Sequence, residues 1–207
     1  SNKKIKTTYM KTSFLTALIL FVSIISFAQN QKTEHLTFKG IAIDGTLTDY
    51  VSKMKQNGFM HQSTNDGIAV LNGDFAGYKG CLISVYTIKQ KDFVDKVVVA
   101  FPDKKTWVTL LGNYNALKEM LTEKYGKPSE VMEEFDERTY SEPTDDRYKI
   151  LSVGLDKCKY SSTWKTAEGD IQLKISHKGV MSTFVTLDYT DKINSEVKRD
   201  NAKDDLR

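Results

Sequence analysis

The chain has 207 residues, of which 40% are hydrophobic and 28% are charged, a length that supports one full hydrophobic core or two small fused ones. Its 30 basic and 27 acidic residues give a small basic excess, but four of the lysines and no acid lie within residues 1–28. The remaining chain is close to neutral and poor in arginine, which argues against binding of nucleic acid or phosphate groups through a cationic surface.

A secretory signal peptide is predicted over residues 1–28. Lys11 precedes an uncharged apolar run at residues 14–25, and the small residues Ser26 and Ala28 follow it. The run is shorter than the roughly 20 residues of a membrane-spanning helix, and no cysteine follows it that would accept a lipid. We therefore expect cleavage directly after Ala28, a periplasmic or secreted protein, and no membrane span once the leader is removed.

A strand and a helix are predicted next. Residues 36–44 have the pattern of a short strand, and Thr46 with Asp49 fits the capping box that begins a helix. Gly58 is placed to end this helix. Its apolar stripe at helical spacing consists of Leu47, Tyr50, Val51 and Met54.

Beyond Gly58 the hydrophobic period becomes that of strands. Four strands separated by turn-forming residues are predicted at residues 59–62, 67–75, 81–88 and 93–101. A second helix follows and is stopped by Gly126 and Pro128, while Gly112-Asn113 leaves open whether it is one helix or two. Its apolar stripe consists of Trp107, Leu110, Leu111, Tyr114, Leu117, Leu121 and Tyr125.

The last third of the chain is predicted to be rich in strands. They are expected at residues 131–135, 148–154, 158–166, 170–177 and 181–190. Residues 191–207 are expected to form a polar tail, a fraying helix that only Ile193 and Val197 anchor.

This order predicts an α+β domain over residues 29–190, an antiparallel sheet with helices on one face. A helix followed by four or five strands occurs twice, which suggests an internal duplication with repeats at about 40–102 and 103–190. The element order resembles the β-lactamase-inhibitor-protein-like fold, which has tandem helix-plus-four-strand units, and exported bacterial proteins often have this general organisation. The resemblance covers about residues 40–190 and includes no diagnostic motif, so it assigns no binding residue.

No catalytic set is recognisable in the sequence. His35, His61 and His177 lie in distant segments and not at metal-ligand spacing, and the acid-rich stretch 130–146 lacks the pattern of a calcium loop. Ser-x-x-Lys matches occur repeatedly in this lysine-rich chain and lack the accompanying motifs of that enzyme class. The sequence therefore indicates no catalytic residues, no metal and no cofactor.

Two cysteines, Cys81 and Cys158, are present in a chain predicted to be exported. Each begins a predicted strand, one in each proposed repeat, so a disulfide would join the two halves. The alternative is two separate buried thiols that pack as small apolar residues.

The two runs of strands differ in hydrophobic pattern. In the second run, apolar Ile171, Leu173 and Ile175 alternate with polar residues, as in a strand with one face in water. In the first run both faces are apolar, and one of them carries the candidate binding residues Leu82, Tyr86, Ile88, Val94 and Val98. Either another part of the chain, such as the loop at 140–150, covers this face, or a partner or second copy does.

The leading hypothesis is a non-enzymatic exported binding module that presents a sheet face to a protein partner or to a second copy of itself. A carbohydrate-binding protein is the alternative, and a hydrolase is the third possibility. The aromatic residues considered for stacking on a carbohydrate are Tyr78, Tyr86, Tyr160, Trp164 and Tyr189.

Overall fold

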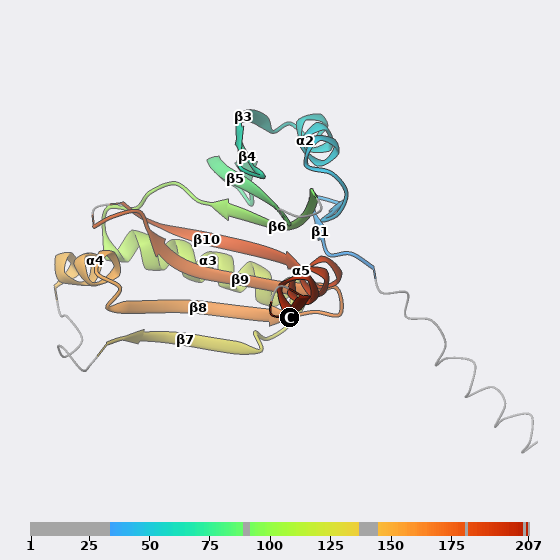
Figure 1. Cartoon of the computed structure of the whole chain (residues 1–207). Helices are drawn as coiled ribbons and strands as arrows, with labels where there is room; N and C mark the ends of the chain where they lie inside the picture. The colour runs from blue at the N-terminus through green and yellow to red at the C-terminus, as the bar shows by residue number, and fades with distance from the viewer. Residues whose placement is uncertain (1–33, 89–91, 137–144, 181, 205, 207) are drawn as a thin grey trace, which may run out of the picture. The chain divides into compact units, whose positions relative to one another are not determined.

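A computed structural model describes residues 34–88, 92–136, 145–180, 182–204 and 206 of the chain (Figure 1). The described residues belong to one compact unit that begins at Glu34. The predicted leader lies outside them, so its cleavage stays a prediction. Within these ranges the protein is an α+β domain, as the sequence predicts, with helices and an antiparallel sheet.

The elements of the first half begin with a small hairpin. They are β1 (Thr37–Phe38), β2 (Ile41–Ala42), α2 (Leu47–Gln56), β3 (Met60–Asn65), β4 (Ile68–Phe75), β5 (Tyr78–Ile88) and β6 (Phe93–Ala100). Those of the second half are α3 (Trp107–Tyr125), β7 (Glu130–Phe135), α4 (Asp146–Gly154), β8 (Cys158–Lys165), β9 (Gly169–His177), β10 (Thr183–Asp191) and α5 (Lys192–Asp204).

Eight strands form one antiparallel sheet in the order β3-β4-β5-β6-β10-β9-β8-β7. Each half is a meander of four strands that follows a helix, and the last strands of the two meanders pair with each other, Val98 opposite Asp188. The two halves therefore have matching strand orders on either side of the β6–β10 pair, and β3 and β7 are the edges. Whether this arrangement arose by duplication stays a prediction.

One face of the sheet carries the hydrophobic core. The buried side chains of α2 and α3 join a single cluster with alternate residues of the strands, among them Leu71, Ile83, Val99, Leu173 and Leu187. Both helices begin at a threonine whose side-chain oxygen accepts a hydrogen bond from a backbone N–H of the first turn. The predicted capping of α2 by Thr46 is confirmed, and α3 runs without a break through Gly112-Asn113.

Two predicted strands are wrong. Residues 36–44 form the β1–β2 hairpin, whose turn residues Lys39 and Gly40 both have positive φ. Residues 148–154 belong to α4, where Asp145 accepts a hydrogen bond from the backbone N–H of Arg147 and caps the helix. Helix α4 buries the adjacent Val153 and Gly154, a pattern that a strand with alternating faces does not produce.

The predicted polar tail is instead a docked helix. α5 contacts β6, β9 and β10, and Asn194 is its buried anchor, whereas Ile193 and Val197 are only half-buried. The Asn194 amide donates to the backbone oxygens of Ile43 and Val94. The anchor is polar because it satisfies backbone carbonyls that would otherwise be buried without a partner.

Candidate functional site

The face of the sheet that α2 and α3 leave uncovered, the open face, is the candidate site. Figure 1 shows α3 behind β9 and β10 and α5 in front of the strand ends. Strands β4, β5 and β6 contribute an uncharged region to this face, the open-face patch, which consists of Ile68, Val70, Leu82, Tyr86, Val98 and Ala100. Leu82 is 44% exposed and the others are half-buried.

Two of the predicted binding residues are not accessible, because Ile88 and Val94 have 1% and 0% of their surface exposed. For Val94 the cause is a β-bulge: Tyr86 pairs with Lys96 and Thr87 with Val94, so Asp95 is an extra residue in β6. The extra residue reverses the facing of β6 and places Val94 in the core. Ile88 follows Tyr86 by two residues in β5 and is buried outside that core cluster. Leu82, Tyr86 and Val98 remain as the accessible members of the predicted set.

A cationic cluster lies beside the open-face patch. The Nζ atoms of Lys96 and Lys174 are 2.8 and 3.0 Å from Oδ2 of Asp188, which is almost fully buried between them. One carboxylate neutralises one of the two ammonium groups, so the cluster keeps a positive charge of about one unit. Lys96 also lies 5.9 Å from the ring centre of Tyr86. The charged Asp188 between the apolar Leu187 and Tyr189 was the sequence signal for this cluster.

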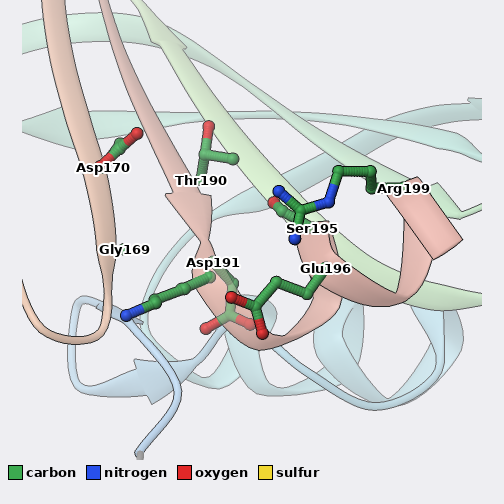
Figure 2. A pocket seen from close by; sticks show the side chains of 8 residues that line it. Gly169, Asp170, Thr190, Asp191, Ser195, Glu196 and Arg199 are labelled. Atoms are coloured by element: carbon green, nitrogen blue, oxygen red, sulfur yellow. The ribbon is translucent and has the colours of Figure 1, made fainter.

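A pocket of about 300 Å³ lies at the rim of the open face, where β9 and β10 meet α5. Figure 2 shows Asp170 and Thr190 on the strand side, and Ser195, Glu196 and Arg199 on the helix side. Arg199 is exposed and has no carboxylate within ion-pair distance among the described residues. The sequence did not indicate this pocket, because the pattern of residues 191–207 predicts a fraying polar tail.

Asp191, at the floor of this pocket, has a structural role. Its carboxylate accepts hydrogen bonds from the backbone N–H groups of Leu36 and Asn194, at 2.7 and 2.9 Å. It also lies 3.1 Å from Nδ1 of His35, whose Nε2 is 3.5 Å from Asp44. Both ring nitrogens of His35 face carboxylates, so neither is available to deprotonate a nucleophile.

The other two histidines also lack the arrangement of a catalytic base. Nδ1 of His177 is 3.0 Å from the carbonyl oxygen of Gly179, and its Nε2 is 3.1 Å from Asp156. His61 contacts Thr64 at the exposed edge strand β3. Among the described residues, no group of three or more acidic, histidine or cysteine side chains is placed to hold a metal ion.

The aromatic residues of the carbohydrate hypothesis are dispersed. Trp164 and Tyr189 are buried, and the Trp164 indole N–H donates to the carbonyl of Gly126. Tyr160 packs edge-on against Trp107, and Tyr78 packs edge-on against Phe101. Of the five, Tyr86 alone belongs to the open-face patch, so these residues do not form a stacking platform.

Of the two alternatives for the cysteines, the disulfide is contradicted. Cys81 and Cys158 are both buried, on β5 and β8, and are not bonded to each other. Three strands separate β5 from β8, which places these strands about 19 Å apart at the usual spacing in a sheet. A disulfide requires Cα atoms within about 7 Å. The second interpretation, two separate buried thiols, holds.

Comparisons with protein-family models, with curated proteins and with solved structures found no match. In the part of the chain that the structure describes, no helix has both the length and the apolar character needed to cross a lipid bilayer.

Proposed function

We propose that this chain is an exported, non-enzymatic binding module that receives a protein partner on the open face of its sheet. The observation that carries the proposal is the open-face patch itself. It is uncharged, its most exposed member is Leu82, and it borders a cluster with excess positive charge. Neutral surface next to a charged rim is the usual anatomy of a protein interface.

Two further observations support the proposal. The described part of the loop at 140–150 belongs to α4, which contacts α3, β8, β9 and β10. It therefore does not cover the open-face patch, which lies on β4, β5 and β6. The leader predicts an envelope or extracellular setting, and the resemblance in element order is to a fold of exported inhibitors. The carbohydrate and hydrolase alternatives have no comparable observation, since the aromatics are dispersed and both ring nitrogens of His35 and of His177 contact other groups.

The test compares Leu82→Glu with Met120→Glu in residues 29–207. Met120 has an exposed fraction of 41%, similar to that of Leu82, but it lies on α3, away from the open face. We expect Met120→Glu to retain the wild-type set of envelope proteins in a quantitative capture, and Leu82→Glu to retain at least about tenfold less, because a carboxylate covered by the partner is desolvated without a counter-charge.

Unchanged melting temperatures of both variants are the control that separates loss of binding from loss of folding. Sedimentation velocity on the same samples distinguishes a heterologous partner from self-association through the same face. Equal capture by Leu82→Glu, Met120→Glu and wild type would contradict the proposal, as would unfolding of Leu82→Glu, since that would place Leu82 in the core.

A further inference from the structure

The edge strand β7 is a second surface with the features of a binding site, independent of the open face. β7 pairs along its whole length with β8, from Glu130 opposite Thr163 to Phe135 opposite Cys158, without a bulge. No other described strand pairs with it, so its outer side is a sheet edge. An edge of this kind offers unpaired backbone groups to an incoming strand.

The backbone groups on the outer side can be identified from the register. The N–H of Asp136 donates to the carbonyl of Lys157, the residue opposite it. In an antiparallel pair bonded and non-bonded positions alternate, so Glu130, Met132 and Glu134 bond to β8. Val131 and Glu133 then direct their N–H and C=O groups outward.

The two edges of the sheet are protected differently. Edge strand β3 has a bulge between His61 and Ser63, a device that hinders the addition of another strand. β7 has no bulge, proline or lysine, and it exposes Val131 and Met132, at 51% and 46%. Exposed apolar side chains on a regular edge are the features that strand addition uses.

The charges of β7 define the segment that fits it. Glu130 pairs with Lys165, and Glu133 pairs with Lys118 at 2.6 Å, so both carboxylates are held against the domain itself. Glu134 has no ion pair among the described residues. A second copy fits poorly, because the outward-bonding residues of two antiparallel copies must lie opposite each other. The two such registers with the largest overlap set Glu130 opposite Glu134, or Glu133 opposite Glu133.

We propose that β7 binds an extended, basic segment of a partner protein by strand addition. The backbone groups of Val131 and Glu133 extend the sheet, Val131 and Met132 contact apolar side chains of the segment, and Glu134 pairs with a lysine or arginine of the segment. This proposal does not depend on the open face.

The experiment uses residues 29–207 and two synthetic peptides, Thr-Lys-Val-Lys-Val-Lys-Thr and the same peptide with glutamate in place of lysine. Amide hydrogen exchange, read by NMR, locates the bound peptide. We expect the basic peptide to protect the Val131 and Glu133 amides and to bind at least about tenfold more tightly than the acidic one, with an affinity that falls as salt is added.

Two variants sharpen the test. Val131→Pro removes an outward N–H without removing a bond to β8, and Val131→Thr keeps that N–H. We expect Val131→Pro to bind the basic peptide at least about tenfold more weakly and Val131→Thr to bind within about twofold of wild type. Glu134→Lys is expected to reduce the preference for the basic over the acidic peptide. This variant tests the proposal even if Val131→Pro does not fold.

Absence of protection at Val131 and Glu133, protection at β3 instead, or equal binding by Val131→Pro and Val131→Thr would overturn the proposal. Each of these outcomes leaves the open-face proposal standing, because Leu82→Glu is not a variant of β7. Conversely, retention of peptide binding in Leu82→Glu is expected.

Discussion

At the scale of single residues, the structure depends on polar side chains that satisfy buried backbone groups. Asp191 joins the N-terminal segment at Leu36 to the start of α5, and Asn194 joins α5 to the first half of the domain. The bond from Asn194 to Asp191 is local, whereas the bonds to Leu36, Ile43 and Val94 span at least 100 positions in the sequence. The contact of Asp191 with Leu36 is therefore a consequence of tertiary structure.

His177 gives a prediction of pH dependence at this scale. Its hydrogen bond to Asp156 and that to the Gly179 carbonyl raise the pKa of the imidazole above its ordinary 6.5. The pKa of His177 is thus higher in the folded than in the unfolded protein. The stability that protonated His177 contributes to the fold is therefore fully present below about pH 6.5, and it is lost as the pH rises through the folded pKa.

An NMR titration of the His177 ring tests this expectation. Asp156→Asn should move the pKa down toward 6.5, and asparagine suits the positive φ of 57° at this position. Glu119→Gln, a change on the exposed side of α3, serves as the control and should leave the His177 titration as it is. A His177 pKa that is the same in Asp156→Asn and wild type would contradict the assignment of the cause.

At the scale of elements, α4 is joined to the N-terminus of α3 by its first residue, Asp146. Both oxygens of Asp146 accept hydrogen bonds from α3, from the backbone N–H groups of Trp107 and Val108 at 3.0 and 3.2 Å. These N–H groups have no partner within a helix, and the carboxylate also suits the positive end of the helix dipole. Helix α4 thus completes the N-terminus of α3.

Removal of this contact should destabilise the domain measurably. We expect Asp146→Ala to lower the free energy of unfolding by about 1 kcal/mol, the usual value of a helix cap. Asp146→Asn, which keeps one acceptor oxygen, should lower the free energy of unfolding by less than Asp146→Ala does. Urea denaturation with a common slope for the three proteins is the measurement, and an Asp146→Ala midpoint equal to that of wild type would show that solvent replaces the carboxylate.

At the scale of the whole molecule, the two halves are joined by the β6–β10 pair and by one continuous core, and no disulfide connects Cys81 to Cys158. The thiol of Cys81 lies in the first half and the indoles of Trp107 and Trp164 lie in the second. Since the core crosses the joint, we expect both halves to unfold in one cooperative transition.

Cys158→Ala makes this testable, because it leaves Cys81 as the only thiol. Labelling of Cys81 and tryptophan fluorescence should report the same urea midpoint, and a reductant should change neither midpoint. Labelling of Cys81 well before the fluorescence transition would show that the first half unfolds separately.

Local signals in the sequence determined the elements whose formation depends on near neighbours. Thr46 caps α2, Gly126 follows the end of α3, and the alternation of Ile171, Leu173 and Ile175 assigns the faces of β9, because capping, left-handed turns and side-chain alternation act over a few residues. The apolar character of both faces of β5 also indicated, correctly, that Leu82 and Tyr86 face away from the core.

Tertiary structure alone decided the features that depend on strand order and on distant partners. The bulge at Asp95 turns Val94 into the core, and the position of the β6–β10 pair separates Cys81 from Cys158. The Lys96–Asp188–Lys174 cluster and the rim pocket under α5 likewise bring together residues from opposite halves or from strands and a helix. Pairing across a sheet is set by contacts among segments far apart in the chain, and no local pattern encodes which segments will be neighbours.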